Sequence, residues 1–218
     1  MPAVPPQGLS HFPYWRQTAG VWSGENTYFD GDLNYNIRSY NRLAIITVNG
    51  RDYTETEHKF YAPGALAQRF AAGAIAADRG IEVIARFTGH MTDDRGTVEI
   101  EDSGQPLAMP GLRPYVSVLS ADSAMRVTPG PNAVDAYRML ITLPTPDRRY
   151  CVNLGLVYAP GSTAAVGDLR GFAVFRENRI QASDFERMRQ IFRARNAVAA
   201  VRDTDAAGKS LISTIGTG

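Results

Sequence analysis

The segment from residue 51 to 61, RDYTETEHKFY, concentrates side chains suited to acid–base chemistry. Alternate residues of an extended strand share a face, so Tyr53, Glu57 and Lys59 lie on the same side. On that side a lysine lies among carboxylates and phenols. Lys59 could stabilise an oxyanion or phenolate, a carboxylate such as Glu57 could accept a proton, and Tyr53 could donate one, each with a pKa tuned by burial. We predict these three as catalytic residues.

The composition of this segment does not show which of its two faces points inward. A strand beside a hydrophobic hairpin partner should have one apolar side, and neither face of this one is apolar. Its polar side chains therefore either line a wet cavity or project from an exposed edge. The opposite register would offer His58 with Thr54 and Thr56. The substrate-binding residues that we predict are Tyr61, Phe87, Tyr137 and His58.

Other kinds of site have little basis in the sequence. The three histidines, His11, His58 and His90, show no metal-ligand spacing. No glycine-rich loop leads from a strand into a helix, so no nucleotide cofactor is expected. The single cysteine, Cys151, lacks a nearby partner for activation and is interpreted as a packed small residue. We therefore expect neither a metal nor a cofactor.

The composition narrows the class of partner. The chain has 218 residues, with 23 Lys and Arg against 22 Asp and Glu, a net charge of +1. A balance this close to neutral argues against nucleic acid and acidic membranes as partners. No apolar run approaches the roughly 18 residues that span a bilayer, and the first residues lack a signal pattern. One cysteine fits a reducing compartment, so we expect a cytoplasmic protein whose partner is a small molecule.

The elements that must position these residues are mostly strands. Runs rich in Val, Ile, Thr, Tyr and Phe alternate with Asp-Gly, Asn-Gly and Pro-Gly, a pattern typical of hairpins. Asn49-Gly50 suits a tight turn, which predicts that the strand ending at Val48 pairs with the strand beginning at Arg51. Nine strands are predicted, at residues 21–29, 34–48, 51–61, 81–92, 97–101, 114–120, 134–143, 149–158 and 168–176.

Two longer helices are predicted beside these strands. Residues 63–77 are rich in alanine and begin with proline, which a first helical turn tolerates, and this helix could act as a lid. Residues 183–202 begin with Ser183 and Glu186 at capping-box spacing, and the helix should pack on the outside of the sheet. Its apolar stripe is predicted to contain Phe185, Met188, Ile191, Phe192, Val198 and Val201. Its solvated face is predicted to contain Arg187, Arg189, Arg193, Arg195 and Arg202.

The remaining segments complete the predicted organisation. Residues 1–10 are interpreted as a loose or peripherally docked arm, residues 11–202 as a single barrel domain and residues 203–218 as a flexible tail. Residues 11–19 are aromatic and could form one helical turn that covers an end of the barrel. Period-two alternation places Ile81, Val83, Ala85, Phe87 and Met91 inside, with His90 outside.

A further alternation bears on oligomerisation. Residues 149–158 have one wholly apolar side, which includes Val152, Leu154 and Leu156. If that side faces outward, it needs a covering helix or a second subunit, which would make the protein a homodimer.

The start and end of the predicted barrel resemble a known family. Gly20-Val21-Trp22 resembles the Gly-x-Trp signature of the lipocalin-like, or calycin, barrels, and the segment LRGFAVFRENRI carries Arg176 and Arg179 before the last helix. In that family an arginine at the end of the last strand stacks over the tryptophan, and Arg176 matches best. Such a contact contributes about 0.5 to 2 kcal/mol. The resemblance implies a mainly β, antiparallel barrel with a helical insertion and a C-terminal helix; an NTF2-like α+β cone is the alternative.

The function predicted from this reasoning is a cofactor-independent lyase. A retro-aldol, deformylation or dehydration step needs a proton acceptor and a cation to hold developing negative charge. Residues 36–61 are similar to bacterial enzymes that remove formaldehyde from lignin-derived aromatic dimers, which implies a small hydroxylated aromatic substrate. The alternative is a non-catalytic binding protein for a hydrophobic ligand or chromophore, and a third hypothesis is an assembly protein that uses the apolar side of residues 149–158.

Overall fold

The fold is built almost entirely from strands. The computed structural model describes residues 8–30, 34–102, 115–120, 123–129, 137–158, 165–204 and 210–215. Its strands are β1 Gly20–Asp30, β2 Tyr35–Asn49, β3 Asp52–Tyr61, β4 Gly80–Met91, β5 Val98–Asp102, β6 Tyr115–Val118, β7 Ala124–Pro129, β8 Tyr137–Pro144, β9 Arg148–Tyr158, β10 Ala165–Ile180, β11 Val198–Thr204 and β12 Ser210–Thr214. Its helices are α1 Pro13–Thr18, α2 Ala65–Ala71 and α3 Phe185–Arg195, with short 3-10 turns at Leu9–His11 and Ala182–Asp184.

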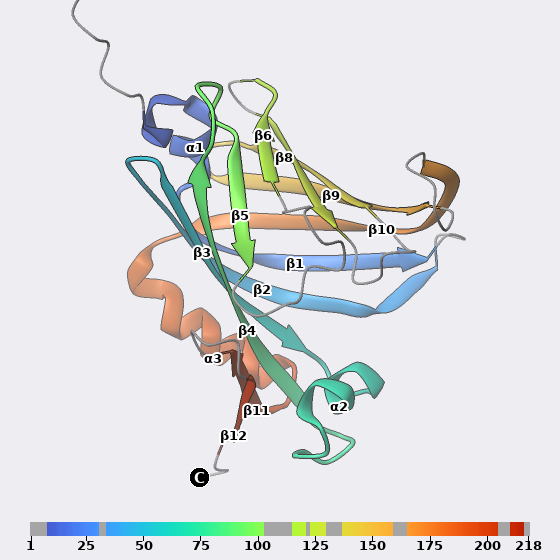
Figure 1. The fold of residues 1–218 in the computed structure, drawn as a ribbon. Coiled ribbons are helices and arrows are strands. Elements are labelled where there is room, and N and C mark those ends of the chain that lie inside the picture. The colour runs from blue at the N-terminus through green and yellow to red at the C-terminus, as the bar shows by residue number, and fades with distance from the viewer. Residues whose placement is uncertain are drawn as a thin grey trace, which may run out of the picture.

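The strands form one curled sheet that closes on itself. Consecutive strands from β1 to β10 are antiparallel neighbours, and β10 pairs back with β1. Along one edge, strand β4 has two different neighbours. Its first half pairs with β11 in parallel, and its second half pairs with β5. Helices α1 and α2 lie at opposite ends of β3 and β4 (Figure 1). The predicted mainly β, antiparallel barrel is therefore confirmed in place of the NTF2-like cone.

The predicted strands and the predicted hairpin are confirmed, with shifted ends. The β2–β3 register pairs Asn49 with Asp52, so Gly50 and Arg51 are the two central residues of the turn, one position later than predicted. Gly50 has a φ of 58°, which glycine adopts without the steric cost that a side chain imposes. Strands β7, β11 and β12 were not predicted. Leu9 is fully buried and its N–H donates to the Gly50 carbonyl, so this part of the arm is docked.

The C-terminal helix is shorter than predicted. Helix α3 ends at Arg195, and Ala197 takes a left-handed φ of 48° before β11 begins. Val198 and Val201 therefore belong to a strand, because residues 198–202 find a parallel partner in β4. Ser183 lies in a 3-10 turn and caps nothing, since the N-cap residue is Asp184. The predicted tail contains the end of β11 and all of β12, which pair with each other.

The helix predicted at residues 63–77 is also shorter. Helix α2 covers Ala65–Ala71 and ends where Ala72 and Gly73 take positive φ angles of 49° and 84°. Among the described residues, no helix has the length and apolar character needed to cross a membrane.

The apolar side predicted for residues 149–158 is described only at Tyr150 and Val152, which are 42% and 39% exposed.

Trp22 closes one end of the barrel. It is fully buried, and its indole N–H donates to the Thr18 carbonyl at 2.8 Å. The guanidinium that stacks on it at 4.5 Å belongs to Arg179, its cross-strand partner in β10. The prediction of Arg176 was wrong, because Arg176 pairs with Glu25 across the strands and binds that carboxylate on the exposed outer side.

Helix α3 packs on the outside of β2 and β3, as predicted (Figure 1). Its apolar face buries Phe192 against Phe60, with ring centroids 5.5 Å apart. Glu82, which has no exposed surface, accepts hydrogen bonds from Arg189 Nε at 2.8 Å and Arg193 Nε at 2.7 Å. The prediction that these two arginines form a solvated face was therefore wrong: they attach the helix to the sheet.

The acid sensitivity of this attachment can be predicted. Burial raises the pKa of Glu82, but the hydrogen bonds from His58, Arg189 and Arg193 lower it by more. The net effect is a pKa lowered from 4.5 to about 2. A carboxyl with a lowered pKa stabilises the folded state above pH 4.5, and the contribution is lost as the pH falls toward 2. We expect Glu82→Gln to lower the free energy of unfolding at neutral pH by about 3 kcal/mol, and the difference from wild type to shrink over that acid range.

Urea unfolding followed by circular dichroism at several pH values measures both effects. The matched control is Asp203→Asn, which removes one carboxylate from the exposed Arg86–Asp203 pair and should cost less than about 1 kcal/mol. Equal losses in the two variants would show that Glu82 does not anchor α3.

Candidate functional site

The structure shows which face of β3 points into the barrel. Glu55 and Glu57 are 3% and 6% exposed and face the interior, and Tyr53 and Tyr61 on the same face belong to two different apolar clusters. On the opposite face, His58 and Phe60 are covered by α3. Polar side chains from residues 53–61 therefore line the inside of the barrel instead of an exposed edge.

A balanced group of buried charges crosses the interior. We call Arg42, Glu55, Glu57, Lys59, Arg149 and Glu177 the ionic cluster. The guanidinium of Arg42 binds three carboxylates: its Nε donates to Glu57 Oε1 at 2.9 Å, and its terminal nitrogens bind Glu55 and Glu177. Arg149 Nε donates to Glu177 Oε2 at 2.7 Å, and Lys59 Nζ lies 2.8 Å from Glu57 Oε2. Three cations thus neutralise three carboxylates.

The surrounding charges favour the ionised forms of Arg42 and Glu177. Burial lowers the pKa of Arg42, but Glu177 and Glu57 raise it well above its usual range. Burial raises the pKa of Glu177, but Arg149 and Arg42 bring it below its usual value. Each charge in the interior is therefore stabilised by opposite charges that the fold places beside it.

Lys59 is the member of the ionic cluster that solvent reaches. Its side chain is 22% exposed, although it points into the barrel. Its Nζ lies 5.8 Å from the ring centre of Tyr40 and 5.9 Å from that of Phe87. Burial lowers the pKa of Lys59, but attraction to Glu57 raises it above its usual value. The side chain is therefore an ammonium held between two aromatic rings, with surface left for a ligand.

An aromatic layer lies between Lys59 and α2. The ring of Tyr61 is 5.0 Å from the rings of both Tyr40 and Phe70, and the ring of Tyr28 is 6.3 Å from that of Tyr40. Burial raises the pKa of Tyr40 and of Tyr61 well above the usual range. Both phenols stay neutral, so they can donate hydrogen bonds but do not act as phenolate bases.

Four of the predicted site residues meet in this region: Lys59, Glu57, Tyr61 and Phe87. Tyr53 is not among them, although it shares their face of β3. It lies six residues from Lys59, about 20 Å along an extended strand. Its hydroxyl donates to Glu55, and its ring packs 5.4 Å from that of Trp15 at the α1 end.

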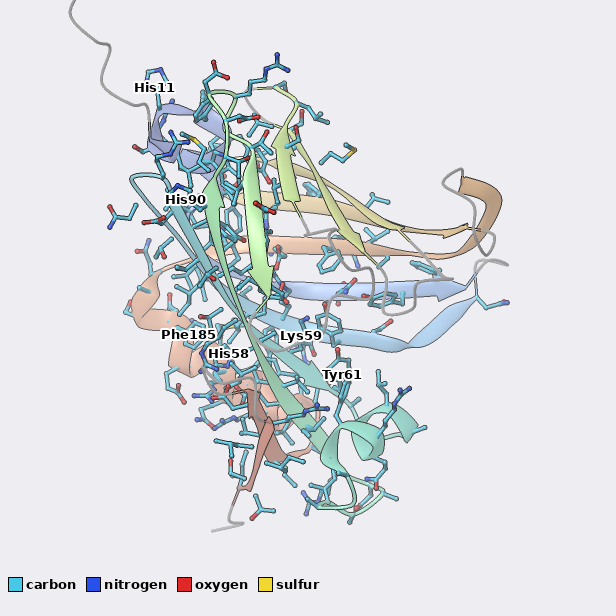
Figure 2. The ribbon with its side chains drawn as sticks, viewed as in Figure 1. His11, His58, Lys59, Tyr61, His90 and Phe185 are labelled. Atoms are coloured by element: carbon cyan, nitrogen blue, oxygen red, sulfur yellow. The ribbon has the colours of Figure 1, made fainter. Side chains whose placement is uncertain are left out.

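His58 lies on the other side of the sheet from Lys59 (Figure 2). Its Nδ1 is 2.6 Å from Glu82 Oε1, and its ring is 5.2 Å from that of Phe185 on α3. The structure therefore separates His58 from Tyr61 and Phe87, two of the other predicted substrate-binding residues. Tyr137 begins β8, and its side chain, like that of Cys151, lies outside the described residues. His90 is exposed beside Asp52, which confirms the prediction of a surface histidine.

Sequence reasoning missed Tyr40, Arg42, Arg149 and Glu177. The predicted hairpin, with Asn49-Gly50 as its turn, would place Tyr40 opposite Lys59, whereas the observed register, with the turn one position later, pairs Lys59 with Arg42. Arg149 and Glu177 had no local signal, because they reach the ionic cluster from β9 and β10.

In the described part of the chain, no three His, Cys, Asp or Glu side chains are grouped to hold a metal ion. The residues suited to an organic ligand are Lys59 and the rings around it.

Comparison with solved structures identifies the fold. Neither a protein-family profile nor a curated protein matches this sequence. The structure of an S-type phycobiliprotein lyase from Guillardia theta superposes with a TM-score of 0.50 at 8% identity, covering 81% of this chain and 94% of that one. A DUF3598-family protein of unknown function from Nostoc punctiforme gives a TM-score of 0.44 at 13% identity, covering 76% of this chain and 49% of that one. The first likeness supports the predicted lipocalin-like fold, whereas neither supports the resemblance to formaldehyde lyases.

The ionic cluster predicts how Lys59 titrates. We expect Glu57→Gln to lower the pKa of Lys59 relative to wild type, because the carboxylate that raises it is gone while burial still lowers it. The pH titration of the Lys59 side-chain resonances by nuclear magnetic resonance measures this pKa. Glu55→Gln is the control, since Glu55 binds Arg42 and Tyr53 and should leave the lysine nearly unchanged. An identical Lys59 titration in wild type and Glu57→Gln would contradict the assignment.

Proposed function

We propose that this protein binds a small molecule with an aromatic body and an acidic group inside the barrel. The observation that carries the proposal is Lys59: a charged ammonium, partly exposed, between the rings of Tyr40 and Phe87. The acidic group binds the ammonium, and the aromatic body lies against those rings and Tyr61. Lipocalin-like barrels offer an interior suited to one small ligand.

The hydrogen-bonding capacity of Lys59 supports this role. An ammonium has three donors, and Glu57 Oε2 takes one of them. The other carboxylate oxygen of Glu57 is occupied by Arg42. Lys59 therefore retains hydrogen-bond donors for a ligand anion, while its ion pair with Glu57 completes the charge balance of the ionic cluster.

The same contacts favour binding over proton transfer. Both oxygens of the Glu57 carboxylate already contact a cation, Oε1 through Arg42 and Oε2 through Lys59. The hydroxyl of Tyr53 already donates to Glu55, far along β3 from Lys59. The predicted acid, base and cation are thus not assembled around one point in the described residues.

A pair of fluorescent probes tests this proposal. Anilinonaphthalene sulfonate carries an anionic group that phenylnaphthylamine lacks, and the two share an aromatic body. We expect Lys59→Met to weaken sulfonate binding about tenfold or more, because a hydrogen bond to a charged group is lost. The affinity for the neutral probe should stay the same, since the rings remain. Fluorescence titration measures both affinities.

Lys59→Arg is the control for these titrations, because it keeps the positive charge and should retain most of the sulfonate affinity. Circular dichroism confirms that each variant is folded. Equal sulfonate binding by wild type and Lys59→Met would contradict the role of the ammonium. A parallel loss for both probes would show that the substitution disturbs the barrel instead.

A lyase is the second candidate, favoured by the same ammonium. A lysine that stays protonated can hold the negative charge left when an aldehyde departs from a hydroxylated aromatic compound. The solved structure of similar fold is itself named a lyase, of phycobiliproteins. A lignin-derived dimer as substrate rests only on the sequence resemblance of residues 36–61.

Incubation with a panel of hydroxylated aromatic dimers tests this second candidate. An enzyme would produce new ultraviolet absorbance and free aldehyde, and Lys59→Met would bind neutral substrates normally but lose at least about tenfold in turnover. The Tyr53→Phe variant separates the predicted proton donor from the site, because its hydroxyl is committed to Glu55 and its removal should leave turnover unchanged. Binding without any aldehyde release would contradict the lyase hypothesis and leave ligand binding as the only function of the two.

A further inference from the structure

A hollow lies on the outer surface of the barrel, away from Lys59. It is a groove of about 460 Å³ where α3 meets the outer faces of β1, β9 and β10. The sheet separates it from the ionic cluster, because successive residues of β10 point to opposite sides. Arg176 lies outside and lines the groove, whereas the carboxylate of Glu177 is turned inward onto Arg42 and Arg149.

The groove gathers positive charge from three elements. Arg148 comes from β9, Arg176 from β10 and Arg195 from α3, and all three are exposed. The carboxylate of Glu25 binds Arg176 and offsets one of the three charges. Within the described part of the chain, neither Arg148 nor Arg195 is paired with a carboxylate. Because the whole chain carries a net charge of only +1, this excess is a local feature.

Apolar groups lie beside these charges. Met188 and Phe192 of α3 line one side of the groove, and Tyr150 of β9, which is 42% exposed, lines another. The guanidinium of Arg195 lies over the ring of Phe192, 5.7 Å from its centre. A volume of this size suits a small organic ligand, and guanidinium groups bind phosphate and carboxylate through paired hydrogen bonds.

We propose that this outer groove is a second binding site, for a small organic molecule that joins a phosphate or similar oxyanion to an apolar ring. The oxyanion contacts Arg148 and Arg195, and the ring packs against Tyr150 and Met188. The two sites share only Glu177, whose carboxylate binds Arg42 and Arg149 inside the barrel. The residues that contact Lys59, which are Glu57, Tyr40 and Phe87, do not line the groove.

Titration with phenyl phosphate tests the proposal. Its affinity is measured by calorimetry, and the methyl resonance of Met188 reports whether the groove is occupied. We expect wild type to bind at millimolar concentration or below with a shift of that resonance. The double variant Arg148→Gln, Arg195→Gln should bind at least about tenfold more weakly, because charge-assisted hydrogen bonds are lost. Inorganic phosphate, which lacks the ring, should bind more weakly than phenyl phosphate.

Two control variants distinguish binding in the groove from a general effect of charge and from binding in the interior. Arg187→Gln removes an exposed arginine of α3 that does not line the groove, and Lys59→Met alters the interior; both should bind phenyl phosphate like wild type. A loss in Arg187→Gln equal to that of the double variant would overturn the proposal, because it would reduce the effect to general charge. Unchanged binding by the double variant, or no shift of the Met188 resonance, would also overturn it.

Discussion

The interior of this protein depends on the ion pairs that the guanidinium of Arg42 makes. It binds carboxylates from two positions on β3 and one on β10, and Arg149 and Lys59 complete the balance. Buried charges are tolerated only when opposite charges and hydrogen bonds surround them, so removing one partner leaves the others at high cost. Since Arg42 and Glu177 are 135 residues apart in the chain, the balance exists only when distant strands are in register.

The ionic cluster also divides the interior into two chemical environments. Toward α1, Trp15, Trp22 and Tyr53 form a closed apolar end that Arg179 seals. Toward α2, Tyr40 and Tyr61 belong to a second apolar cluster. Lys59 lies where the two meet, which explains how a cation can be enclosed by aromatic rings and still be reached by solvent. This position underlies the proposed binding of an acidic aromatic ligand.

Helix α3 acts on the outside of the same sheet. Its arginines at positions 189 and 193 share the buried carboxylate of Glu82, and its apolar face covers Phe60. Where the edge of the helix leaves the sheet uncovered, Arg195 and Met188 help to form the outer groove. One helix thus both stabilises the outer face of β3 and creates a second surface with its own charge. The arginines of α3 therefore serve two different purposes according to what the sheet places opposite them.

The sequence by itself determined the features that depend on near neighbours. Its period-two patterns and turn residues located nine strands, and Gly50 predicted the β2–β3 hairpin, because turn geometry and alternation are local properties. Lys59, Glu57, Tyr61 and Phe87 were found for the same reason. Only the tertiary structure decided that residues 198–201 form a strand beside β4, that Arg179 instead of Arg176 stacks on Trp22, and that Arg42 and Glu177 meet. These outcomes depend on pairing between distant strands, and a shift of one residue in such a pairing moves a side chain to the opposite face of the sheet.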